Sequence, residues 1–207
     1  MRAEKTDTET RRGQITEAAI ALISDGGINN LNIAGIAEKI GIVPSAVYRH
    51  FKNKEEILGA TLLLVREQLL NNVAKVEAEA DGALARLRLL LELHANLLKR
   101  NPVFPHIVFA HFSQSDDTKR WSNLDSTINA YLQGIARVVK QGQQMGEIRP
   151  EIPAHNIAMM FIGLVLPIAM LHRPSDEKLD ILQHLDVAWQ VFVRGLEPNN
   201  IKMKIKD

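Results

Sequence analysis

The chain has 207 residues, with 25 Lys and Arg against 24 Asp and Glu, and its formal net charge is +1. It is 46% hydrophobic and contains no Cys, which excludes a disulfide framework, a thiolate nucleophile and a Cys-ligated metal site. This length predicts one or two domains with a substantial core. The balanced charge gives no global indication of a nucleic-acid partner.

Neither end of the chain nor its most apolar stretch predicts a membrane protein. Residues 1–14 are polar and lack the apolar centre of a secretory signal, which fits a cytoplasmic location. Residues 152–172 contain no Lys, Arg, Asp or Glu, but His155, Asn156 and Pro167 interrupt the run. The apolar part left is short of the roughly 20 residues that a spanning helix needs. We therefore expect a helix buried in a core or a subunit interface.

Apolar residues at helical spacing predict an N-terminal group of short helices. The first includes residues 15–23 and should end at Asp25-Gly26-Gly27, because glycine accepts the left-handed conformation that closes helices. Asn32 can cap a second helix that Gly41 ends, and Pro44 suits the first turn of a third.

The rest of the chain has the same helical periodicity over longer stretches. Asn53 and Glu56 resemble a capping box at the start of a long helix. Further helices are expected at 82–100, 118–143, 154–172 and 175–196, with a short segment at 104–112. No stretch alternates long enough to predict a strand, so the predicted fold class is all-α.

Residues 32–51 have the pattern of a helix-turn-helix, in which the first helix braces a second that enters the major groove of DNA. Four basic residues and no acidic residue lie between 39 and 54, which leaves 21 basic against 24 acidic residues elsewhere. This local patch is typical of phosphate binding. Two short helices around a glycine also occur in many other helical proteins. The predicted inward side chains are Val43, Val47, His50 and Phe51, and the predicted outward ones are Ser45, Tyr48, Arg49 and Lys52.

Residues 11–58 resemble the DNA-binding domain of TetR/AcrR-type transcriptional regulators, through the first helix with its Gly-rich end, IAEKIGI and YRHFKNKEEIL. The resemblance implies a homodimer with an all-α C-terminal ligand domain. It also implies that Ser45, Ala46 and Arg49 face the bases, and that Tyr48, His50, Lys52 and Lys54 contact phosphates. Val43 stands where the family usually has a Thr or Ser cap, and Asn32-Ile33 replaces a common Thr pair. His50 could instead be half buried against the brace helix without touching DNA.

The remaining residues suggest a dimer surface and an effector pocket. A recognition helix of about two turns touches few base pairs, so we expect two copies that read successive major grooves. We expect the partner to contact Phe161, Gly163, Leu164, Leu182, Leu185, Trp189 and Phe192; the alternative is that these residues close the protomer's own core. Candidate walls of an apolar pocket are His94, Phe104, Phe109, Phe112, Tyr131 and Met160, each of which could also be ordinary core.

No catalytic motif or metal-ligand spacing stands out, so no enzyme activity, cofactor or metal is expected. The predicted division is a DNA-binding domain at 1–55, an effector and dimerisation domain at 56–198, and a basic tail at 199–207. We expect a ligand-responsive repressor that a small apolar effector releases from a palindromic operator on double-stranded DNA. The alternatives are an activator, or an all-α binding protein whose helix-turn-helix is vestigial.

Overall fold

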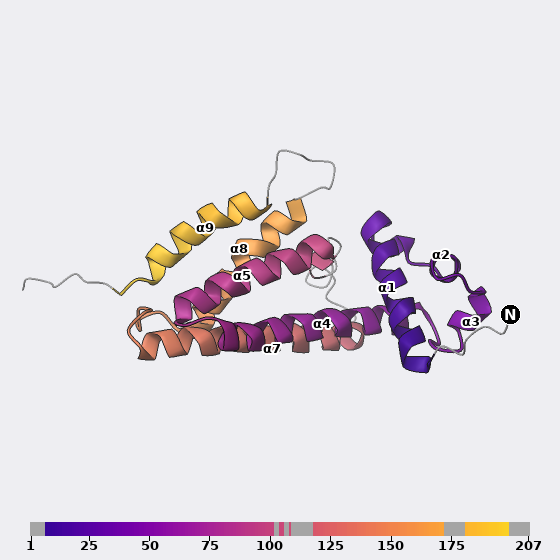
Figure 1. The fold of residues 1–207 in the computed structure, drawn as a ribbon, viewed down its shortest axis with the longest axis horizontal. Coiled ribbons are helices and arrows are strands. Elements are labelled where there is room, and N and C mark those ends of the chain that lie inside the picture. Colours follow the sequence, from indigo (N-terminus) through magenta and orange to yellow (C-terminus); the bar gives the residue numbers. More distant parts are fainter. Residues whose placement is uncertain (1–6, 102–103, 106–107, 109–117, 172–180, 199–207) are drawn as a thin grey trace, which may run out of the picture. The chain divides into compact units, whose positions relative to one another are not determined.

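The computed structural model describes residues 7–101, 104, 105, 108, 118–171 and 181–198, and all the regular structure within them is helical (Figure 1). The all-α prediction is confirmed. The short elements are α1 (Thr8–Gly26), the 3-10 turn η1 (Ile28–Asn30), α2 (Ile33–Lys39) and α3 (Pro44–Val47). The long ones are α4 (Lys54–Glu79), α5 (Ala83–Arg100), α7 (Thr118–Gln144), α8 (Ala154–Leu171) and α9 (Ile181–Leu196).

The chain forms two compact units. The first comprises Met1–Gln68 and Arg100–Thr127, and the second comprises Leu69–Lys99 and Ile128–Asp207. Helix α4 therefore begins in the first unit and ends in the second. The predicted basic tail at 199–207 lies outside the described residues, and so does the start of the helix predicted at 175–196.

In the first unit, side-chain caps and glycine turns set the helix ends as the sequence predicted. Gly27, with φ of +76°, ends α1 by donating its N–H to the carbonyl of Ile23 at 2.7 Å. The side-chain oxygen of Asn32 accepts the N–H of Gly35 at 2.7 Å and so caps α2. Helix α2 packs against both α1 and α3. The core of this group contains the fully buried Ile15, Ile23, Ile36, Phe51 and Ile57.

In the second unit, the buried faces of α5, α7, α8 and α9 form the core, with α8 and α9 packed together. The carboxylate of Glu147 accepts the N–H groups of Ala83 and Leu84 at 2.7 and 3.3 Å, which caps α5 from a distant loop. Gly142 allows α7 to pass close to α5, because a Cβ there would lie 2.5 Å from the Cβ of Ala83.

Helix α8 is the one helix in the described part of the chain that is long and apolar enough to cross a membrane. Its inner face is buried at Ile157, Phe161 and Val165, while Pro167 lies exposed within the helix. This is the placement expected of an apolar helix that covers a protein core.

Candidate nucleic-acid interface and effector site

Helices α2 and α3 are joined by a tight turn with helix-turn-helix geometry. Gly41 has φ of +69°, and the N–H of Ile42 returns to the carbonyl of Ala37 at 2.9 Å, which closes α2. Pro44 begins α3, where its missing N–H is not needed. The side chains of Val47 and Phe51 are buried and anchor the recognition segment to the rest of the unit.

The outward side of this segment is free for contact with DNA. Ser45, Tyr48, Arg49, Lys52 and Lys54 are all exposed, while Ala46 and His50 are half buried. The exposed group combines a small hydroxyl near the start of α3 with long basic side chains after it. Such a surface can offer a guanidinium to base edges and ammonium groups to phosphates.

Two expectations about the recognition segment need correction. Helix α3 covers a single regular turn, and Tyr48–His50 continue it as a turn in which the N–H groups of Arg49 and His50 donate to the carbonyls of Ala46 and Val47 at 3.3 and 3.0 Å. Val43 was predicted to face inward but is 63% exposed. The physical reason is its extended backbone at the N-cap position, with ψ of +146°, which turns the side chain away before the helix begins.

Arg12 of α1 joins three parts of this interface, and the sequence pattern gave no indication of it. Its guanidinium donates to the backbone carbonyl of His50 and lies 3.9 Å from the ring centroid of Phe51. It also approaches the carboxylate of Glu56 at 3.5 Å. Because the partners of Arg12 lie about forty residues away, no local motif could have found this contact.

Glu56 continues the same network into the start of α4. Its carboxylate accepts the N–H of Lys52 at 2.7 Å, and its own N–H donates to the side-chain oxygen of Asn53 at 2.8 Å. The bond from Lys52 and the nearby Arg12 hold the pKa of Glu56 below its ordinary value. The predicted capping box is therefore present, with the reciprocal bond displaced to the N–H that precedes Asn53.

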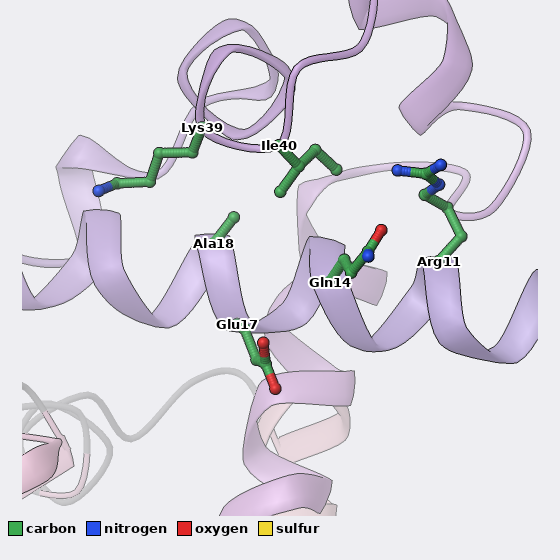
Figure 2. Close-up of a pocket in the computed structure, with 6 residues that line it drawn as sticks. All are labelled: Arg11, Gln14, Glu17, Ala18, Lys39 and Ile40. Atoms are coloured by element: carbon green, nitrogen blue, oxygen red, sulfur yellow. The ribbon is translucent and has the colours of Figure 1, made fainter. Parts of the chain in front are cut away.

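Beside this interface, α1 and the end of α2 enclose an open hollow of about 380 Å³ (Figure 2). Its lining residues are Arg11, Gln14, Glu17, Ala18, Lys39 and Ile40. Figure 2 shows Ile40 facing the side of α1 that carries Ala18, with Lys39 and Arg11 at opposite ends. Four of the six lining residues have charged or amide side chains, so the hollow does not suit an apolar effector.

Two of the predicted effector residues lie together within one unit of the structure. His94 of α5 and Tyr131 of α7 meet in the second unit, with ring centroids 5.2 Å apart and ring planes at 88°. Phe104 is also buried but belongs to the first unit, and Phe109 and Phe112 lie outside the described residues. Met160 is 59% exposed on α8 and so does not line an interior pocket, because it lies on the outward side of the helix.

His94 and Tyr131 are both neutral in this environment. Burial lowers the pKa of His94 to about 4, because the interior disfavours the charged imidazolium. Burial also raises the pKa of Tyr131 above its ordinary value. The imidazole Nδ1 and the phenolic oxygen have no hydrogen-bond partner within the described part of the chain.

Of the seven residues predicted to contact a dimer partner, three are buried within the protomer. Phe161, Leu185 and Phe192 are buried, and the rings of Phe161 and Phe192 are 6.1 Å apart. Leu164 and Trp189 are half buried, Gly163 is exposed, and the side chain of Leu182 is outside the description. An apolar stripe suits a protomer core and a partner surface equally well, so the stripe alone does not decide between these two roles. The exposed large apolar residues of these helices are Met159, Met160, Leu171, Val187 and Val191.

A search of the described residues finds no group of three or more His, Asp or Glu side chains that could hold a metal ion. Two places within these residues bear on the predicted function. One is the basic outer side of the recognition segment, and the other is the neutral His94–Tyr131 pair.

Comparison with known proteins covers both halves of the chain. Residues 15–61 match the profile of bacterial regulatory proteins of the tetR family, and residues 65–195 match that of the YsiA-like protein C-terminal region. The fatty acid metabolism regulator protein of Bacillus subtilis is 24% identical over 88% of this chain and 94% of that protein. Nucleoid occlusion factor SlmA of Yersinia enterocolitica is 26% identical over 94% of this chain and 100% of that protein. The structure of FadR from Bacillus subtilis in complex with stearoyl-CoA has a TM-score of 0.72 at 22% identity, over 89% of this chain and 99% of that one.

Proposed function

Because the chain belongs to the TetR family of bacterial regulatory proteins, we propose that it is a cytoplasmic, homodimeric repressor that an acyl-CoA releases from a palindromic operator. The single observation that carries this proposal is the exposed basic side of a braced helix-turn-helix. Ser45, Tyr48, Arg49, Lys52 and Lys54 are presented together while Val47 and Phe51 hold the segment from behind. The surface has no acidic residue between 39 and 54 to repel phosphate.

We assign the two kinds of DNA contact to different residues. Arg49 carries the long planar donor group that can read guanine in the major groove, and Ser45 and Ala46 lie at the entry of α3. Tyr48, Lys52 and Lys54 surround this centre and suit phosphates, and Lys54 also lies at the start of α4. The backbone carbonyl of His50 accepts a bond from Arg12, which fixes the backbone at this residue. Because His50 is half buried, only the exposed part of its ring is available to a phosphate.

A second copy of the chain supplies the specificity that one recognition turn cannot. Two copies about 34–36 Å apart would read successive major grooves. The exposed apolar residues Met159, Val187 and Val191 on the packed pair α8 and α9 offer a surface for that contact. Gly163 lies one turn after Met159 on α8 with open space around it, which would let a helix of the partner approach closely.

The effector class is supported by the second unit and by the relatives. Its core is apolar apart from neutral polar groups, which suits a hydrocarbon chain. The relative from Bacillus subtilis is named for fatty acid metabolism, and the similar FadR structure holds stearoyl-CoA. Binding would release DNA only as far as the effector binds the released state more tightly than the DNA-competent one.

A duplex titration tests the proposal. A fluorescent duplex, selected from a random library with the purified protein, is titrated at rising salt and then with palmitoyl-CoA. Neutralisation of 6–10 phosphates would reduce affinity by roughly 10³–10⁵ between about 50 and 200 mM salt. Lys54→Ala should weaken all sequences alike and lower the salt slope by about one, whereas Arg49→Ala should relax sequence preference. No binding at low salt would refute the DNA-binding role, and binding that acyl-CoAs leave unchanged would refute the effector.

A further inference from the structure

The interior of the second unit holds two polar side chains, each with a polar atom that no residue in the described part of the chain pairs. His94 is 5% exposed and Tyr131 is 2% exposed, and their rings meet edge to face across α5 and α7. Along α5, the residues one turn before and after His94 are all buried leucines: Leu90, Leu91, Leu97 and Leu98. Each of the two polar residues therefore presents its free atom within an apolar region.

The unpaired polar atoms of this pair lower the stability of the core, whereas two apolar side chains in the same places would leave no buried polar atom unpaired. A buried donor or acceptor without a partner costs about 1–3 kcal/mol, and most buried polar groups in folded proteins are paired. Phenylalanine in place of Tyr131 and leucine in place of His94 would keep the packing and remove both unpaired atoms. Two such atoms on contacting rings therefore indicate that a bound molecule supplies their partner.

The chemistry of the pair limits what that partner can be. The imidazole and the phenol are both uncharged, and together they can donate and accept hydrogen bonds. Of the side chains that the structure describes, none of the buried ones is a lysine or an arginine. A carboxylate bound here would lose its hydration without gaining a counter-ion, which is strongly unfavourable. A neutral carbonyl oxygen would lose much less and gain a hydrogen bond.

A hollow lies between α5 and α9 in the same unit. It has a volume of about 220 Å³, and its lining includes Leu91, Arg88 and Asp186. Leu91 lines this hollow and is buried one turn before His94, so the hollow begins about one helical turn from His94 along α5. The rim is polar, because Arg88 is paired with Glu92 and Asp186.

We propose that His94 and Tyr131 form the polar subsite of the effector site and recognise the neutral thioester carbonyl of an acyl-CoA, whose hydrocarbon chain lies among the neighbouring leucines. This inference rests on the proposed function, because it names residues that would read the effector proposed there. Apolar walls alone bind any hydrocarbon chain. The proposed subsite would make the protein prefer a thioester to a free fatty acid and to a chain that lacks the carbonyl.

The test compares three probes on the full-length protein by calorimetry: palmitoyl-CoA, palmitate and S-hexadecyl-CoA, a thioether that lacks the carbonyl. Tyr131→Phe and His94→Phe should each weaken palmitoyl-CoA binding about three- to tenfold, which is the loss of one neutral hydrogen bond. The same variants should leave the already weaker binding of the thioether unchanged. His155→Phe is the matched control, since it removes an exposed imidazole from the second unit and leaves the buried pair intact.

The outcomes separate this inference from the proposal beneath it. Wild-type protein that binds none of the probes overturns both the effector class and the subsite. If the wild-type protein binds palmitoyl-CoA and the thioether equally well, the subsite is refuted and the effector class stands. The same conclusion follows if the variants weaken the binding of both probes alike. A thermal melt without ligand completes the design: Tyr131→Phe should melt at or above the wild-type temperature, and marked destabilisation would show that the hydroxyl has a structural role instead.

Discussion

Removing the Arg12 side chain should loosen the junction between the recognition segment and α4. In Arg12→Ala the carbonyl of His50 loses its donor, the ring of Phe51 loses the guanidinium above it, and Glu56 loses its cationic neighbour. Because these contacts join α1 to both sides of the segment that ends at Phe51, the variant should bind every DNA sequence more weakly.

The expected loss follows from the individual contacts. A hydrogen bond from a charged donor contributes about 1.5–3 kcal/mol, and we take the lower end because the Arg12 side chain is 39% exposed. The guanidinium over Phe51 adds about 0.5–1 kcal/mol at a partly exposed position. The ion pair to Glu56 faces solvent, so we assign it no stabilisation. The free energy of unfolding should fall by about 2 kcal/mol.

Urea denaturation followed by circular dichroism measures this change, and two matched variants show which contact produces it. Arg12→Lys keeps the charge but not the planar donor, so it should lose most of the same stability. Glu56→Gln keeps an oxygen that can accept the N–H of Lys52, so its urea midpoint should stay close to that of the wild type. An Arg12→Ala loss below about 0.5 kcal/mol, the size of an ordinary surface substitution, would refute the assignment. So would an Arg12→Lys variant as stable as the wild type.

Three further predictions concern the second unit and its surface. The pKa of His94 is lowered from 6.5 to about 4, so the unfolded chain binds a proton first as the pH falls. The free energy of unfolding should therefore drop by about 3 kcal/mol between pH 6.5 and 4. In His94→Phe, urea midpoints measured across this range should lack that pH-dependent drop. Gly142→Ala should destabilise by about 1–3 kcal/mol in thermal melts, because the new Cβ would lie 2.5 Å from Ala83, whereas Gly163→Ala has open space and should not destabilise the protomer. Val191→Asp should shift the sedimentation equilibrium toward monomer by placing a charge on the exposed apolar side of α9, and Met145→Asp, at another exposed apolar position, should leave the equilibrium unchanged.

Local signals in the sequence determined the helix boundaries well. Asn32, Asn53, Gly27 and Gly41 act through bonds to residues a few positions away, and each lies where its chemistry predicted. The exposed basic side of the recognition segment was also predictable, because it depends on spacing along one short stretch.

What the sequence could not determine depended on distant partners. Arg12 reaches residues near 50 and 56, and nothing around position 12 indicates this. Phe161 and Phe192, which we expected at a dimer surface or in the protomer's own core, are buried within the protomer, and α8 and α9 carry other apolar residues that are exposed. Periodicity shows that a face is apolar, but only the packed structure shows which apolar face is already covered.

The single-turn length of α3 has a consequence for how this protein can change. A helix of four residues has almost no stability of its own, so its shape is imposed by Val47 and Phe51 behind it and by Arg12 and the Asn53 cap beyond it. The side chains proposed to read bases take no part in that support. Mutations at Ser45, Ala46 and Arg49 can therefore alter the preferred operator while leaving the fold almost untouched. Within this one segment, the residues that hold the fold and the residues proposed to choose the DNA sequence are therefore different ones.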